Sequence, residues 1–129
     1  MKLEQISLAR QLDMAFRAMD EELSSIRSGT VFVHIRNNTI GKFGIKHNPI
    51  DSLAEYLPNE GLTPVQRRDF RQMAIQALKF KNGWTHGEIH FDFVIRKNTL
   101  MMNVMFESNY NMANLVSTGA WGKVPMVNE

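Results

Sequence analysis

Residues 89–106, IHFDFVIRKNTLMMNVMF, decide the fold, because apolar side chains alternate with other residues on both sides of Lys97-Asn98. A period of two is typical of strands with one buried face, and asparagine tolerates the positive φ of a tight turn. A two-residue turn at this point sets apolar residues opposite apolar residues along both strands, which fixes the register. The predicted pairs are Ile95 with Leu100, Phe93 with Met102, Phe91 with Val104 and Ile89 with Phe106.

An earlier stretch predicts another hairpin. Val31 and Val33 alternate on its first strand, and Phe43 and Ile45 on its return strand. A two-residue turn would send these two pairs to opposite faces, because successive strand residues point to opposite sides. We therefore predict a three-residue loop over residues 37–39, which sets Val33 against Phe43 and Val31 against Ile45.

A helix is predicted before each hairpin. Residues 4–27 carry apolar side chains at spacings of three and four, which predicts one helix about 35 Å long. Thr63, Pro64 and Gln66 have the pattern of a capping box, so a second helix should run to about Lys79. The residues that this helix should bury are Phe70, Met73, Ala74, Ala77 and Leu78.

The two helix–hairpin units also resemble each other in sequence. Residues 16–19 (FRAM) match residues 70–73 (FRQM), and residues 35–40 (IRNNTI) match residues 95–100 (IRKNTL). We interpret this order as a pseudo-duplicated αββ-αββ chain of the α+β class, in which a four-stranded antiparallel sheet carries both helices on one face. The predicted organisation is a single domain over 1–129, with repeat halves at about 4–47 and 63–107 and an irregular segment at 108–129.

Composition restricts the class of protein. The chain has 129 residues, of which 43% are hydrophobic and 22% charged, as in an ordinary globular domain. Its apolar stretches are shorter than the roughly 18 residues that cross a bilayer, and it has no cysteine for disulfides or thiolate ligands. We expect a cytoplasmic protein of a bacterium or its phage, with no membrane partner and no cofactor.

One candidate site lies on the outward side of the second hairpin. His86, Glu88 and His90 alternate on its first strand, and the register places Glu107 opposite Glu88. Imidazoles and carboxylates bind divalent metals, and opposed carboxylates repel unless a proton or cation lies between them. These four residues could form a metal site, an acid–base pair or a small-ligand site. The alternative is the solvated face of a half-buried sheet, and no residue fits a known catalytic motif.

Methionine marks a second candidate surface. Val94, Met101 and Met105 point outward on the same hairpin, so its last strand is apolar on both faces. Such a strand is normally covered. The cover is either the C-terminal segment, including Trp121, or a second subunit or partner, for which methionine is an adaptable contact residue. The long predicted first helix also favours pairing with a copy of itself.

The first hairpin and second helix predict a nucleic-acid surface. An exposed aromatic ring can stack on a base while nearby lysines and arginines contact phosphates. The formal charge of +2 gives this hypothesis only weak support. The candidate residues are Phe32, Arg36, Lys42, Lys46, Arg67 and Arg71.

These patterns together favour a non-enzymatic binding protein that acts through the outward sheet face. The expected partner is a second copy of the chain, in a homo-oligomer, or one macromolecule of another kind. The alternatives are a nucleic-acid-binding regulator at the first hairpin and a small metal-dependent or acid–base enzyme, or small-ligand binder, at the second.

Overall fold

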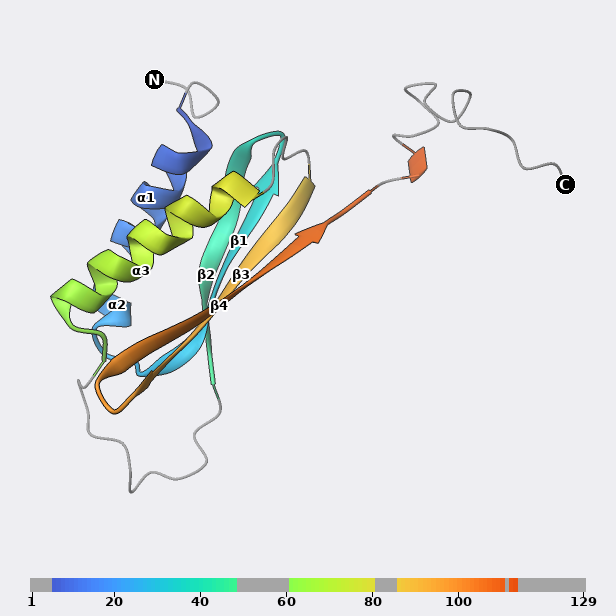
Figure 1. Ribbon diagram of the computed structural model, residues 1–129. Helices are drawn as coiled ribbons and strands as arrows, with labels where there is room; N and C mark the ends of the chain where they lie inside the picture. Colours follow the sequence, from blue (N-terminus) through green and yellow to red (C-terminus); the bar gives the residue numbers. More distant parts are fainter. Residues whose placement is uncertain (1–5, 49–60, 81–85, 111, 114–129) are drawn as a thin grey trace, which may run out of the picture.

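The computed structural model describes residues 6–48, 61–80, 86–110 and 112–113. Four strands form one antiparallel sheet in the order β2-β1-β3-β4, and the helices cover one of its faces (Figure 1). This confirms the predicted α+β class, whereas the pseudo-duplication stays a prediction. Most of the segment 108–129, which was predicted to be irregular, lies outside the described residues. The elements are α1 (Leu8–Ala18), α2 (Asp20–Leu23), β1 (Ser28–Arg36), β2 (Thr39–His47), α3 (Pro64–Ala77), the 3-10 helix η3 (Leu78–Phe80), β3 (His86–Arg96) and β4 (Thr99–Ser108).

The β3–β4 hairpin has the predicted register. Lys97 and Asn98 form the two-residue turn, with φ of 50° and 62°. Positive φ at both positions matches the right-handed twist of the flanking strands. All four predicted apolar pairs are present, from Ile95 with Leu100 to Ile89 with Phe106.

The loop of the β1–β2 hairpin differs from its prediction. The turn has two residues, Asn37 and Asn38, with φ of 52° and 60°, so the predicted three-residue loop is wrong. A β-bulge changes the register instead, because the pairing passes from Ile35 with Ile40 to Val33 with Phe43. The extra residue of β2 restores the apolar pairing, as a longer loop would have done. The predicted pairs of Val33 with Phe43 and Val31 with Ile45 are therefore both present.

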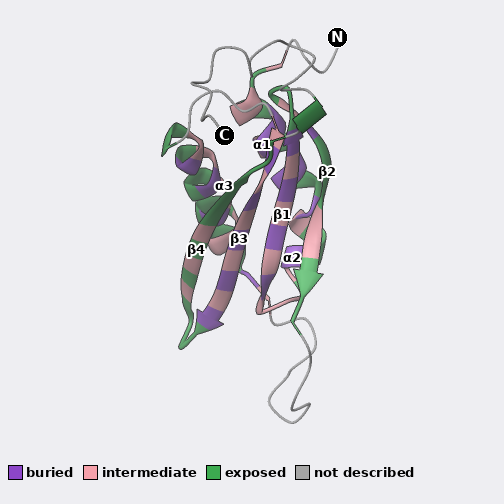
Figure 2. Cartoon of the chain, turned by 90° about the vertical axis from the view of Figure 1, so that its right-hand side faces the viewer, coloured by how far each residue is buried: buried purple, intermediate pink, exposed green. Residues whose placement is uncertain are grey.

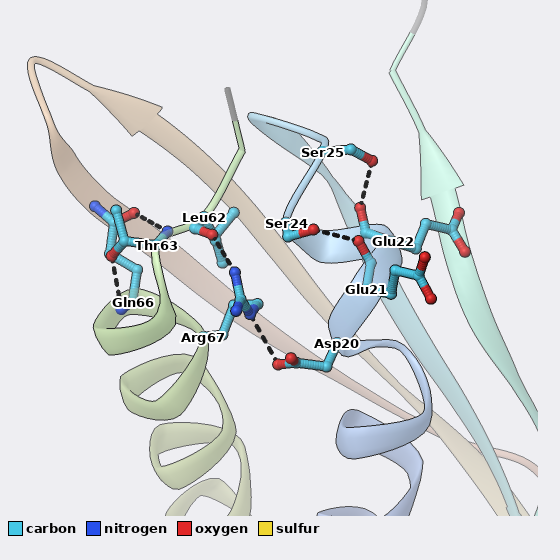
Figure 3. Close-up of polar contacts among 9 residues, drawn as sticks. All are labelled: Asp20, Glu21, Glu22, Ser24, Ser25, Leu62, Thr63, Gln66 and Arg67. Carbon is cyan, nitrogen blue, oxygen red and sulfur yellow. Dashed lines mark hydrogen bonds and ion pairs between the residues drawn. The ribbon is translucent and has the colours of Figure 1, made fainter. Parts of the chain in front are cut away.

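The single long helix predicted over residues 4–27 is also wrong, because the helix breaks at Met19. This residue has φ −98° and ψ 4°, and the short α2 follows it. The three acids of α2, which begin at Asp20, lie in its first turn, where the positive end of a helix dipole stabilises them. Ser24 and Ser25 then donate side-chain hydrogen bonds to the carbonyls of α2, which end it (Figure 3).

Helix α3 begins with the predicted capping box. The Thr63 hydroxyl accepts from the Gln66 backbone N–H, and the Gln66 side chain accepts from the Thr63 N–H (Figure 3). One turn later, Arg67 donates to Asp20 at 2.9 Å and to the Leu62 carbonyl at 2.6 Å. The bond to Asp20 attaches the start of α3 to α2. Met73, which was predicted to be buried, is 53% exposed.

Three phenylalanines form the centre of the core between the helices and the sheet. Phe16 of α1 lies 5.0 Å from Phe70 of α3 and 5.7 Å from Phe91 of β3, measured between ring centroids. The rings meet edge to face, which is a favoured geometry for aromatic pairs. Buried residues alternate along β1 and β3 (Figure 2), so each central strand presents its other residues on the opposite side of the sheet.

Candidate functional site

The sheet face that points away from the helices is called the outer face. In the part of the chain that the structure describes, no helix or strand covers it (Figure 2). Strand register sorts its side chains into rows that run from β2 to β4. The three central rows are Lys46, Thr30, Asp92 and Asn103; Gly44, Phe32, His90 and Met105; and Lys42 at the bulge, His34, Glu88 and Glu107.

Glu88 lies between two imidazoles on this face. Its Oε1 atom is 3.1 Å from Nε2 of His34 and 3.2 Å from Nε2 of His90. His34 is the direct partner of Glu88 on β1, whereas His90 is two residues further along β3. The contact with His34 could not be predicted from the sequence, because the pairing of β1 with β3 has no local signal.

The four residues proposed for a metal site lie on the outer face but do not form a cluster of ligands. Glu107 is directly opposite Glu88, and His86 is directly opposite Arg36. Across the described ranges, no three histidine, aspartate or glutamate side chains are arranged to hold one metal ion. The metal site stays a prediction, and His34 would be the closest additional donor to Glu88.

The proposed nucleic-acid residues separate into two groups. Phe32 lies on the outer face, with its ring packed over Gly44: a Cβ added to Gly44 would come within 2.9 Å of the ring. Nζ of Lys42 is 5.8 Å from the centroid of the same ring. Arg36 and Lys46 are on the same face by register.

The other two candidates belong to the helix layer. Arg67 pairs with Asp20 at 2.9 Å, and Arg71 pairs with Asp13 at 3.1 Å. Both arginine side chains are only 16% exposed. The structure therefore does not bring Arg67 and Arg71 together with Phe32.

The three proposed interface residues lie toward β4. Val94 is paired with Met101, and Met105 is paired with His90. Met101 is 54% exposed and Met105 57% exposed, although both lie on a regular strand. Trp121, the proposed cover, lies outside the described residues.

Among the described residues, two of the hollows adjoin the sheet. One, of about 600 Å³, lies at the β3–β4 turn end of the outer face and includes Asp92, which accepts a 2.5 Å hydrogen bond from Thr30. The other, of about 380 Å³, lies between α1 and β2 and is lined by apolar residues such as Met14 and Phe43. The second hollow could not be predicted from the sequence, because it depends on the bulge in β2 and on the packing of α1.

No family model, curated protein or solved structure matches this chain. Within the described ranges, no helix has the length and apolar character needed to cross a bilayer. The function is therefore inferred from the chemistry of the outer face.

Proposed function

We propose that this protein is a cytoplasmic, non-enzymatic binding protein whose outer sheet face holds a protein partner. One observation carries the proposal. Met101 and Met105 are more than half exposed beside Val94, on a face that no other described element covers. Apolar side chains on an uncovered sheet normally mark a contact surface, and methionine adapts its shape to a partner.

The charges of the outer face favour a protein partner over a nucleic acid. Phosphate-led binding requires a surplus of basic groups. On this face Glu88, Asp92 and Glu107 are interspersed with the bases. The bases on the same face are Arg36, Lys42, Lys46 and Arg96.

Nucleic-acid binding remains the second candidate, supported by Phe32 with Lys42 above its ring. Arg67 and Arg71 do not add phosphate contacts to this surface, because both are paired with acids in the helix layer. Binding that weakens steeply as salt rises would support this candidate over a protein partner.

A matched pair of methionine variants tests the proposal. We expect native mass spectrometry of protein purified from its own cells to show the wild type in an assembly heavier than one chain of 14.8 kDa. The Met105→Glu variant should appear mainly as a single chain, because it buries a charge in the contact. The Met73→Glu variant carries the same change at a 53% exposed position on α3, and it should assemble like the wild type.

Two results would contradict the proposal. One is a wild-type protein that appears only as a single chain. The other is a Met105→Glu variant that assembles as fully as Met73→Glu.

A further inference from the structure

We propose that the partner is a second copy of this chain, and that two outer faces pack against each other about a twofold axis parallel to the strands. This inference rests on the proposed function, because it names the occupant of the same surface. The axis passes between β1 and β3, the two central strands. It places β2 over the partner's β4 and β1 over the partner's β3. Stacked sheets keep their strand directions within about 30° of each other, so residues at the same level along the strands meet.

The charges of one row are complementary under this symmetry. Lys42 on β2 is placed over the partner's Glu107 on β4, and His34 is placed over the partner's Glu88. The twofold axis repeats each contact, so the row forms four contacts between an acid and a basic group. Glu107, which is directly opposite Glu88 within one chain, thereby receives Lys42 as a neighbour of opposite sign, which relieves the repulsion between two adjacent carboxylates.

The shapes of the next row are also complementary. On the β2 side, the ring of Phe32 covers Gly44 and forms a platform with no side chain rising from position 44, and Nζ of Lys42 lies over the ring at 5.8 Å from its centroid. On the β4 side, Met105 is 57% exposed. The axis places Met105 over the partner's platform, where its sulfur can contact the aromatic ring.

Charge also distinguishes this axis from the other simple arrangement. A twofold axis perpendicular to the strands and passing through the central row would place β2 over the partner's β2, with Lys42 over the partner's Lys46. Like charges in such positions oppose association. Four strands of nine to eleven residues give a face of about 19 Å by 33 Å, which is of the order of the ~800 Å² that each partner of a standard interface buries.

Site-specific crosslinking tests the arrangement, and the cysteine-free chain suits it. Lys46 is predicted to lie over the partner's Asn103, because both belong to one row. Purified Lys46→Cys and Asn103→Cys variants are mixed and treated with a thiol-reactive crosslinker that spans about 8 Å, since stacked sheets lie about 10 Å apart. We expect the mixture to give roughly tenfold more crosslinked dimer than either variant alone.

The controls make the result decisive. A mixture of Lys46→Cys with Met73→Cys has the second thiol on α3 and should give only the background yield. Equal yields from this mixture and the Asn103→Cys mixture would overturn the inference. So would Lys46→Cys that crosslinks to itself as well as to Asn103→Cys, because the proposed axis places the two copies of Lys46 at opposite edges of the interface.

Light scattering of the purified wild type separates this inference from the proposed function. We expect twice the single-chain mass of 14.8 kDa. A single-chain mass, with a different protein bound in the cell and released by Met105→Glu, would overturn the second copy and leave the proposed function intact. A single-chain mass with no cellular assembly would overturn both.

Discussion

Phe70→Ala is expected to lower the free energy of unfolding by about 3–5 kcal/mol, the usual cost of removing a fully buried phenyl ring. Phe70 is fully buried on α3, and its ring contacts Phe16, Phe91 and Phe93 at centroid distances of 5.0, 6.3 and 5.2 Å. The substitution leaves a cavity where both long helices meet the sheet. Urea denaturation followed by circular dichroism measures the change.

The control for this experiment lies on the same helix. Met73→Ala removes a side chain that is 53% exposed and should change the free energy of unfolding by less than about 0.5 kcal/mol. Equal losses for Phe70→Ala and Met73→Ala would mean that the core is not centred on this ring cluster.

Gln11→Met is expected to lower the free energy of unfolding by about 1–3 kcal/mol, because it removes the side-chain partner of the buried Ile40 N–H and of two part-buried carbonyls. Gln11 is 3% exposed on α1. Its Oε1 accepts from the Ile40 N–H at 2.7 Å, and its Nε2 donates to the carbonyls of Asn38 at 3.2 Å and Ile6 at 2.8 Å. This side chain therefore attaches α1 to the turn of the β1–β2 hairpin.

Methionine has nearly the volume of glutamine, so Gln11→Met tests the hydrogen bonds rather than the packing. Gln76→Met makes the same change at an exposed position of α3 and should be close to neutral. The same denaturation assay measures both variants. A Gln11→Met protein as stable as the wild type would show that these hydrogen bonds do not hold α1 to the hairpin.

The sequence predicted the elements whose signals are local. The β3–β4 register follows from apolar alternation on both sides of Lys97-Asn98, and the start of α3 follows from Thr63 and Gln66. Both signals lie within a few residues of the feature that they specify, so no knowledge of the rest of the chain was needed.

Two of the errors arose where different structures share one apolar pattern. A longer loop and a β-bulge both set Val33 against Phe43, so alternation alone does not distinguish them. The apolar stripe of the first helix continues through Met19 and Leu23, which are both buried, although the helix breaks between α1 and α2. The local sign of the break was the acidic run that begins at Asp20, since acids favour the first turn of a new helix.

The candidate site was predicted only in part, because half of it depends on contacts between distant residues. Glu88 and His90 were placed on one face by their spacing, but His34 joins them only through the pairing of β1 with β3. The spacing of Arg71 along its helix predicted a phosphate contact. The packing of α3 on α1 instead pairs this arginine with Asp13. The order of strands and the packing of helices have no signal in a local pattern.

The central claim is that a second molecule covers the outer face, and methionine oxidation tests it most directly. Within one chain, Met101 and Met105 are 54% and 57% exposed, close to Met73 at 53%. Hydrogen peroxide oxidation followed by peptide mass spectrometry measures the rate at each position across a range of protein concentrations. We predict that Met101 and Met105 oxidise several-fold more slowly than Met73 at high concentration, and that the rates converge on dilution. Equal rates for all three at every concentration, or protection that persists on dilution, would contradict the claim.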